Sequence, residues 1–286
     1  MRMTRRGAMM GVATIAAGGW SPGAWAAGED ALAALEARHG GRLGVALLDA
    51  NGEVLTARRG DERFAMCSTH KLLSAALVLS RVDARQESLA RRVIFSAQDL
   101  VTYSPATERA VGGEGMTLEA ICAAAITLSD NTAGNLLFDS FGGPAALTAY
   151  LRTLGDEVTR SDRIELALND VPPGEERDTT TPLAMARLMR TLLLSDALAQ
   201  PSRAKLAQWL IDNKTGDRRL RAGLPPAWRV GDKTGTGGRA ETNDVAILWP
   251  PEGRPLILTA YYVEADAPAA QRDAVLADVA RALVRA

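Results

Sequence analysis

The chain has 286 residues, of which 47% are apolar and 23% charged, so it can bury a sizeable core in one or two domains. A net charge of −1 and an aromatic content of 5% argue against nucleic-acid binding, which needs a basic surface or a base-stacking platform. Two cysteines and two histidines form no short zinc-binding cluster, and no glycine-rich nucleotide loop occurs, so we expect no metal and no cofactor.

The first 26 residues are typical of an export signal. Three arginines within the first six residues precede an apolar run at 8–20, and Ala-Trp-Ala at 24–26 offers a cleavage site. A membrane anchor is disfavoured because the apolar run is short and is followed by glycine and proline. We expect residues 1–26 to be a cleaved signal peptide and the mature protein to be periplasmic or secreted. The choice between Sec and twin-arginine export stays open.

The mature chain is predicted to begin with a helix and a hairpin. Residues 29–39 carry apolar side chains at helical spacing. Residues 43–47 then alternate between apolar and smaller or polar side chains, as a strand does. Asn51-Gly52 is a strong hairpin-turn signal, and the strand that follows it starts at 54–55.

The middle of the chain, 61–212, is rich in alanine and leucine and predicts mostly helices. The far end returns to strands, which we expect at 229–236, 245–249 and 256–263. A last helix is expected at 268–286, where apolar residues form one stripe.

These elements predict an α/β (α+β) fold. We expect an antiparallel five-stranded sheet, flanked by the terminal helices, with an inserted all-helical domain. Residues 27–60 and 213–286 would form the α/β domain, and residues 61–212 the all-α domain. The active site is expected between the two domains, where ligand sites most often lie.

Ser68-Thr69-His70-Lys71 precedes an apolar run at 72–79. If this run is a helix, Ser68 lies at its N-terminus and Lys71, three residues on, shares its face. A serine hydroxyl is a weak nucleophile without a neighbouring base, and a helix N-terminus supplies positive potential for an oxyanion. The pattern Ser-x-x-Lys is common, so a helix cap followed by a surface lysine stays open as an alternative.

Three further motifs narrow the interpretation. Ser-Asp-Asn at 129–131 follows an apolar stretch, and Lys-Thr-Gly at 233–235 lies on a predicted strand. Together with Ser-x-x-Lys, in this order, they resemble the signature of the penicillin-recognising serine enzymes. Arg-Ile-Glu-Leu-Ala-Leu-Asn at 163–169, followed by Arg-Asp-Thr-Thr at 177–180, resembles the omega loop of class A serine β-lactamases. The resemblance covers nearly the whole mature chain.

The resemblance implies catalytic roles for the matching residues. Ser68 would be the acylated nucleophile, and Lys71 and Glu165 are the two candidate bases for acylation. Glu165 and Asn169 would hold the water that hydrolyses the acyl-enzyme. Ser129 would pass a proton to the departing β-lactam nitrogen.

The resemblance also implies a substrate-binding surface. Asn131 would hydrogen-bond the acylamido side chain, and Tyr103 would line the entrance. The backbone N–H groups of Ser68 and Thr236 would form the oxyanion hole. The substrate carboxylate would be bound by Lys233, Thr234 and Thr236, and Gly235 between them would also belong to the substrate-binding surface.

The chain departs from many family members in the position of the arginine that would bind the substrate carboxylate. Many penicillinases carry an arginine on the strand after Lys-Thr-Gly, but Thr242 stands at that position here. Arg219 matches a position where some members supply the missing arginine. We expect its guanidinium to bind the substrate carboxylate with two parallel hydrogen bonds. The alternative, a solvated basic cluster, stays open.

Other departures concern small features. His70 stands where the family more often has an apolar or small residue, and we expect a buried spacer rather than a catalytic histidine. Cys67 and Cys122 lack the partners of the family's known bridges, so both should be free. The family further implies a cis peptide bond after Glu165 and a salt bridge between Arg163 and Asp178.

The sequence therefore predicts a secreted, monomeric β-lactamase that hydrolyses penicillins and cephalosporins through an acyl-enzyme on Ser68. Its partners would be the β-lactam and a catalytic water, with no nucleic acid and no membrane. Alternatives are a D,D-peptidase and a non-hydrolytic penicillin sensor domain. Glu165 argues against both, because D,D-peptidases lack this carboxylate and a sensor needs no water-activating acid. The ranking of substrates and the sensitivity to inhibitors stay open.

Overall fold

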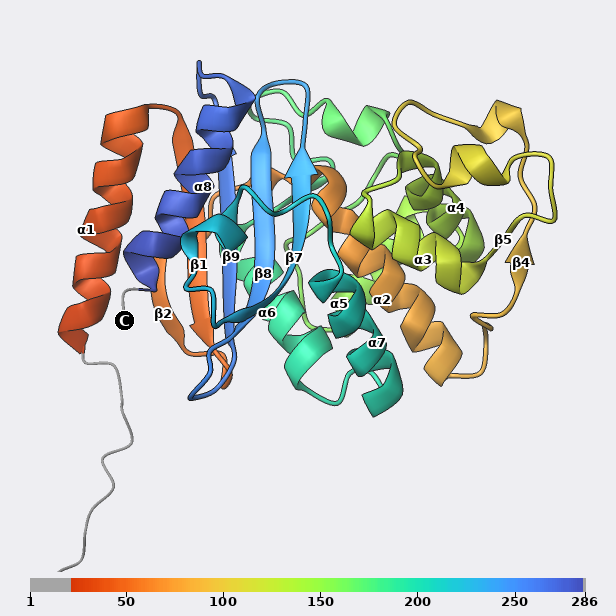
Figure 1. Ribbon diagram of the computed structural model, residues 1–286, viewed down its shortest axis with the longest axis horizontal. Coiled ribbons are helices and arrows are strands. Elements are labelled where there is room, and N and C mark those ends of the chain that lie inside the picture. The colour runs from red at the N-terminus through yellow and green to blue at the C-terminus, as the bar shows by residue number, and fades with distance from the viewer. Residues whose placement is uncertain (1–21, 285–286) are drawn as a thin grey trace, which may run out of the picture.

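A computed structural model describes residues 22–284 and contains the predicted five-stranded antiparallel sheet (Figure 1). The strand order is β2-β1-β9-β8-β7, so both ends of the chain contribute to one sheet. The strands are β1 (Arg42–Asp49), β2 (Val54–Arg58), β7 (Arg229–Thr236), β8 (Thr242–Trp249) and β9 (Leu256–Val263). The strands predicted at 229–236 and 256–263 are confirmed at both ends, and the others are a few residues longer than predicted.

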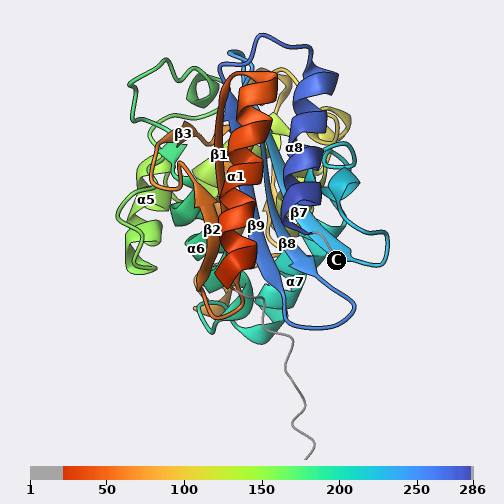
Figure 2. The same ribbon diagram turned by 90° about the vertical axis from the view of Figure 1, so that its left-hand side faces the viewer.

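The two terminal helices, α1 (Pro22–His39) and α8 (Ala269–Leu283), lie side by side on one face of the sheet (Figure 2). Side chains alternate between the two faces of a strand. In β1, Leu43 and Leu47 therefore pack toward these helices, whereas Leu48 packs into the core on the opposite face.

Helix α1 is longer than the predicted 29–39. It begins at Pro22, a residue well suited to the first position of a helix, and continues through a segment rich in alanine. The predicted signal peptide, residues 1–26, lies outside the described residues except for 22–26, which begin this helix.

Helices occupy the middle of the chain, as predicted, and cover the other face of the sheet, where α6 contacts β1 and β9 (Figure 1). They are α2 (His70–Asp83), α3 (Leu118–Thr127), α4 (Asn131–Phe141), α5 (Pro144–Thr153), α6 (Pro182–Leu194) and α7 (Gln200–Ile211). The short strands β3 (Phe64–Ala65) and β6 (Thr179–Thr180) pair, as do β4 (Arg92–Val93) and β5 (Met116–Thr117). Short 3-10 turns are η1 (Cys67–Thr69), η2 (Ala97–Asp99), η3 (Thr107–Ala110), η4 (Ala167–Asn169) and η5 (Leu220–Gly223).

Helix α2 lies at the centre of the helical region. Every residue from His70 to Leu79 is buried, and the helix contacts α3, α4, α5 and α7. A helix that is buried on all sides belongs to the core rather than to the surface. The first turn of α2 is therefore held rigidly between the sheet and the helices, which is where a precise site can form.

We propose the domain division expected from the sequence, with 27–60 and 213–286 in an α/β domain and 61–212 in an all-α domain. Two hydrophobic clusters support it. One joins the terminal helices to the sheet, and a larger one fills the helical region and reaches the opposite face of the sheet.

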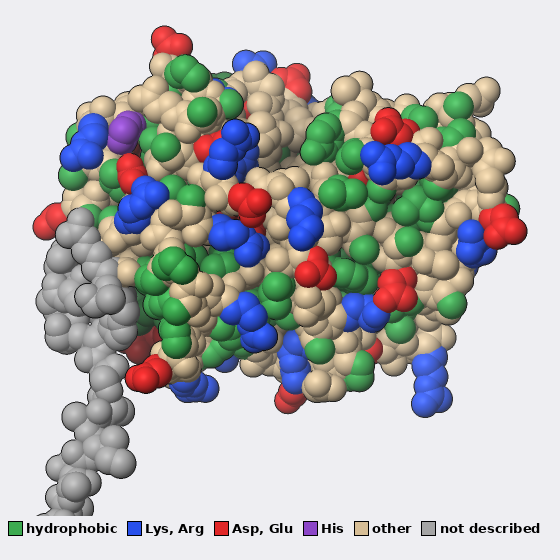
Figure 3. Space-filling view, in the orientation of Figure 1, with side chains coloured by type: hydrophobic (Ala, Val, Ile, Leu, Met, Phe, Trp, Pro, Cys, Tyr) green, Lys and Arg blue, Asp and Glu red, His purple; other side chains and the backbone are tan. Residues whose placement is uncertain are grey.

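The surface is mixed in charge. On the face drawn in Figure 3, basic and acidic side chains are interspersed rather than gathered into one basic patch. Among residues 22–284, no helix is long and apolar enough to cross a membrane.

Both cysteines are free, as predicted, and both are buried. Burial raises the pKa of the Cys67 thiol and of the Cys122 thiol, so neither should form a reactive thiolate near neutral pH. We expect the native protein to resist alkylation, and the denatured, unreduced protein to take up two alkyl groups as measured by intact mass. A denatured protein that takes up none would reveal a disulfide and contradict this assignment.

Candidate active site

Ser68 lies in turn η1, which leads directly into α2, so its hydroxyl is at the N-terminal end of that helix. Nζ of Lys71 donates a hydrogen bond to Oγ of Ser68 at 2.9 Å. The contact is the one that the three-residue spacing predicted. Cys67, just before the serine, has a left-handed φ of 45°, an uncommon conformation for a residue with a Cβ that often marks functional sites.

The side chain of Lys71 is fully buried among oxygen atoms. Besides Ser68, its Nζ lies 2.6 Å from Oδ1 of Asn131, 3.0 Å from the carbonyl oxygen of Ser129 and 2.8 Å from Oε1 of Glu165. Burial lowers the pKa of Lys71, and the attraction of Glu165 only partly opposes this. The amine can therefore give up a proton more readily than a lysine in water.

Glu165 is buried and is held at both its carboxylate and its backbone. Oε2 accepts a hydrogen bond from Nδ2 of Asn169 at 2.7 Å. The amide of Asn135 binds the backbone N–H and carbonyl of Glu165 at 2.8 and 3.1 Å. Burial alone would raise the pKa of Glu165, but the Lys71 ammonium and the His70 ring outweigh it and hold this pKa below its usual range. The carboxylate is therefore ionised at neutral pH and can accept a proton from water.

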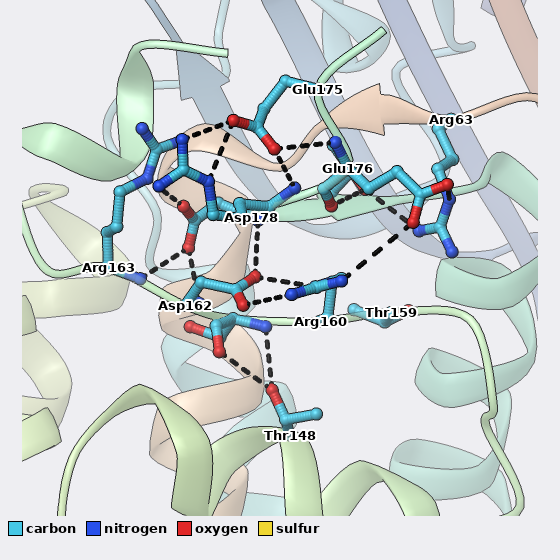
Figure 4. A network of polar contacts seen from close by, with 12 residues as sticks. Arg63, Thr148, Thr159, Arg160, Asp162, Arg163, Glu175, Glu176 and Asp178 are labelled. Atoms are coloured by element: carbon cyan, nitrogen blue, oxygen red, sulfur yellow. Dashed lines mark hydrogen bonds and ion pairs between the residues drawn. The ribbon is translucent and has the colours of Figure 1, made fainter.

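The loop at 161–178 carries Glu165 and is closed by Asp178 (Figure 4). One oxygen of Asp178 accepts two backbone N–H groups at 2.7 and 2.9 Å. The other accepts a hydrogen bond from Nε of Arg163 at 2.6 Å, which confirms the predicted salt bridge. The peptide bond between Glu165 and Leu166 is cis, as predicted.

The Ser-Asp-Asn motif forms the turn between α3 and α4. Asp130 is the N-cap of α4 and accepts further backbone N–H groups, which fixes the turn. Oγ of Ser129 accepts a hydrogen bond from Nζ of Lys233 at 3.0 Å. Asn131 donates through Nδ2 to a backbone carbonyl at 2.8 Å, so its Oδ1 faces Lys71.

The Lys-Thr-Gly motif lies on β7, as predicted. Lys233 is fully buried, and its Nζ also donates to the carbonyl of the next residue at 2.8 Å. Burial and the nearby Lys71 hold the pKa of Lys233 well below its usual range. A Cβ on Gly235 would lie 2.8 Å from the carbonyl oxygen of Met66, so the close approach of β7 to the nucleophile turn requires glycine.

Arg219 is buried beside the same strand. Its Nη1 donates to two backbone carbonyls of β7 and β8 at 2.8 and 2.7 Å, and its Nη2 donates to Oγ1 of Thr236 at 2.8 Å. Nε pairs with Asp273 at 2.8 Å. The neighbouring Arg218 has a side chain that is 81% exposed. The guanidinium of Arg219, and not that of Arg218, is therefore held against the predicted carboxylate-binding hydroxyl.

Tyr103 is exposed and lies next to the Ser-Asp-Asn turn. Its carbonyl oxygen accepts the backbone N–H of Asn131 at 3.0 Å, and its φ of 66° is left-handed. The ring is thus free for contact with solvent or substrate, as a residue at the entrance of the site must be.

Apart from the Arg163–Asp178 pair, sequence reasoning did not anticipate the residues that hold the site residues in place. Asn135 lies one helical turn after the Ser-Asp-Asn motif, and this spacing was the only local signal. The hydroxyl of Thr215 lies 2.5 Å from that of Thr234, and Arg221 pairs with the buried carboxylate of Asp232. These partners are 11 to 19 residues apart on different elements, so no local pattern reveals them.

The assembled groups suit acyl transfer to a serine followed by attack of water. A hydroxyl, a buried amine and a buried carboxylate lie in hydrogen-bond contact, and a second buried lysine extends the cluster. In the described part of the chain, no three His, Cys, Asp or Glu side chains are placed to hold a metal ion.

Comparison with known proteins gives a consistent result. The model of the beta-lactamase enzyme family matches residues 28–286. Beta-lactamase FAR-1 of Nocardia farcinica is 49% identical over 254 residues, which are 89% of this chain and 81% of that protein. Beta-lactamase CTX-M-8 of Citrobacter amalonaticus is 48% identical over 250 residues, 87% of this chain and 86% of that protein. An ancestral (GNCA) class A β-lactamase of known structure is 60% identical, with a TM-score of 0.88 over 90% of this chain and 98% of that chain.

The fold, the order of the four motifs and these similarities agree. The chain belongs to the class A β-lactamases, hydrolases that act on the β-lactam amide.

Proposed function

We propose that this β-lactamase hydrolyses penicillins and cephalosporins through an acyl-enzyme on Ser68 and thereby confers resistance to them. The observation that carries the proposal is the position of Nζ of Lys71, 2.9 Å from Oγ of Ser68 and 2.8 Å from Oε1 of Glu165. The Lys71 amine thus connects the nucleophile to a buried carboxylate. A D,D-peptidase lacks this carboxylate and a penicillin sensor does not need it, so we favour hydrolysis over both.

In acylation, Oγ of Ser68 bonds to the β-lactam carbonyl carbon as its proton passes to a base, and the carbon–nitrogen bond of the ring breaks. Lys71 and Glu165 are the candidate bases. Ser129 gives a proton to the ring nitrogen and regains one from the base, so the net transfer is from Ser68 to nitrogen. The backbone N–H groups of Ser68 and Thr236 stabilise the oxyanion.

In deacylation, Glu165 takes a proton from a water molecule that it holds together with Asn169. The resulting hydroxide attacks the ester carbonyl carbon, the bond to Oγ breaks, and the proton returns to Ser68. The 2.7 Å hydrogen bond from Asn169 to Oε2 keeps that oxygen and the amide side by side, as two ligands of one water must be.

Substrate binding uses the groups around this centre. Asn131 binds the acylamido group and Tyr103 lines the entrance. The substrate carboxylate is bound by cationic and hydroxyl groups on and beside β7, namely Lys233, Thr234, Thr236 and Arg219, and Gly235 belongs to the same substrate-binding strand.

We further propose that the protein is exported with cleavage of residues 1–26 and acts as a monomer in the periplasm or outside the cell. The basic, apolar and Ala-Trp-Ala sections of this segment support export. Its partners are the β-lactam and the catalytic water, without a cofactor, a metal, nucleic acid or a membrane.

Glu165→Ala is expected to acylate but hardly to deacylate. Loss of a positioned general base costs about 10²–10⁴-fold, roughly 3–5 kcal/mol of barrier. Intact-mass spectrometry after mixing with benzylpenicillin should show a long-lived adduct on Ser68. Multiple turnover by this variant at the parent rate would contradict the assignment.

Arg219→Ala is expected to lower kcat/KM for penicillins by about 10- to 100-fold, the usual effect of losing a hydrogen bond to a charged group. Arg218→Ala is the matched control, because its side chain is exposed, and it should behave like the parent. Circular dichroism must show both variants folded. Equal and small effects from the two would mean that Lys233 and the hydroxyls bind the carboxylate alone.

A further inference from the structure

His70 lies inside the catalytic cluster although it has no part in the mechanism above. It is the first residue of α2 and lies between the nucleophile and Lys71 in the sequence. Its side chain is only 1% exposed. Its ring stacks on Phe138 of α4, with ring centroids 5.0 Å apart and an interplanar angle of 7°. The sequence-based expectation that this histidine is buried is confirmed, and its ring is fixed in orientation.

Both ring nitrogens of His70 have polar partners. Nε2 lies 3.4 Å from Oε1 of Glu165, and Nδ1 lies 3.3 Å from Oγ of Ser74. An ionised carboxylate can only accept hydrogen bonds, so the proton of a neutral ring must be on Nε2. Nδ1 is then an acceptor, and the buried Ser74 hydroxyl is the group that donates to it. The two contacts together select one tautomer.

The two oxygens of Glu165 are thereby distinguished. Oε1 faces Nζ of Lys71 at 2.8 Å and Nε2 of His70 at 3.4 Å, whereas Oε2 accepts from Asn169. Lys71 must change its contacts or its protonation during the proposed cycle. A neutral imidazole need not, so it is the constant donor to Oε1.

We propose that His70 is a positioning residue for Glu165: its Nε2–H group holds Oε1 and leaves Oε2 directed toward the hydrolytic water. This inference deepens the proposed function and rests on the role of Glu165 as the base of deacylation. It assigns no proton transfer to His70, which stays neutral and keeps its hydrogen on Nε2.

The charged groups around His70 determine how its contact with Glu165 affects the pH dependence of deacylation. The titratable groups that act on His70 and Glu165 are Lys71 on α2, Lys233 on β7 and Cys67 on η1, and Asp130 before α4 acts on Lys71. They come from separate elements, and none of them belongs to the ring that the variants replace.

Burial lowers the pKa of His70, which keeps the ring neutral, and the ring in turn helps to lower the pKa of Glu165. A carboxylate with a lowered pKa stays ionised at acidic pH and can act as a base there. It loses this ability only as the pH falls through that pKa. Without the His70 donor the pKa of Glu165 rises, so the acidic limb of deacylation should move to higher pH.

The test compares His70→Phe, which keeps a flat ring against Phe138 but has no donor, with His70→Gln, whose amide can donate from near the position of Nε2. Single-turnover deacylation of benzylpenicillin is measured across pH, together with Tm. We expect His70→Phe to slow deacylation about 10-fold, the effect of losing one hydrogen bond to a charged group, and to shift its acidic limb to higher pH. His70→Gln should restore most of both.

A lower Tm with parent deacylation and an unchanged acidic limb in His70→Phe would overturn the proposal, because it would leave His70 a purely structural role. Equal defects in the Phe and Gln variants would overturn it as well, since the donor would then not matter. If His70→Phe fails to fold, His70→Leu replaces it, because it is apolar and also removes the donor: it should slow deacylation and shift the acidic limb in the same direction, and a parent rate with an unchanged limb would overturn the proposal.

Glu165→Gln, measured alongside, separates a failure of the role proposed for Glu165 from a failure of the role proposed for His70. If this variant deacylates as fast as the parent, the proposed role of Glu165 is wrong. If it accumulates acyl-enzyme while His70→Phe behaves like the parent, only the role of His70 is wrong.

Discussion

The site depends on one buried ion pair. Nζ of Lys71 and Oε1 of Glu165 are 2.8 Å apart, and both side chains are fully buried. Taking either charge out of water alone costs several kcal/mol, so each group is stable there only while the other and its fixed dipoles are present. Both pKa values are lowered, but for different reasons: burial lowers that of Lys71 and outweighs the attraction of Glu165, whereas the Lys71 ammonium lowers that of Glu165 and outweighs burial.

The rest of the fold keeps the two halves of this pair at a fixed separation. Lys71 is carried by α2, which the helical core buries on all sides. Glu165 is carried by a loop that has little regular structure, and polar contacts replace the missing packing. Asp178 joins the two ends of that loop, and Asn135 of α4 binds the backbone of Glu165 itself. Rigidity therefore comes from packing on one side and from hydrogen bonds on the other.

A second group of buried charges lines the sheet side of the site. Lys233 and Arg219 are both buried there, as are the carboxylates of Asp232, Asp244 and Asp273, and Asp273 pairs with Nε of Arg219. Each cation reaches a group of the site, Lys233 through Ser129 and Arg219 through Thr236. Both side chains are therefore held close to the position proposed for the substrate carboxylate.

Local patterns in the sequence predicted the strands well, because alternation and turn residues are properties of neighbouring positions. The strand at 229–236 was found with the same ends. The start of α1 was missed, because the prediction relied on the apolar stripe at 29–39 and gave no weight to the alanine-rich segment that precedes it. The motif residues were brought together by family resemblance and not by periodicity, which cannot show that Ser68 and Glu165 lie in one cluster.

Contacts between distant residues mark the limit of such reasoning. The burial of His70 was expected because the family more often has an apolar or small residue at this position. Its contact with Glu165, 95 residues away, depends on how the loop at 161–178 folds back over α2, and no local signal carries that information. The same holds for Asn135, whose partner lies 30 residues away.

The most direct test of the account is an NMR titration of the Glu165 carboxyl carbon in glutamate-labelled protein, with Glu165→Gln used to assign the signal. The buried pair with Lys71 predicts that this carboxyl stays ionised well below the pH at which an ordinary glutamate, with a pKa of about 4.3, takes up its proton. A signal that titrates at or above that value would show that burial outweighs the ion pair, and would contradict the central claim.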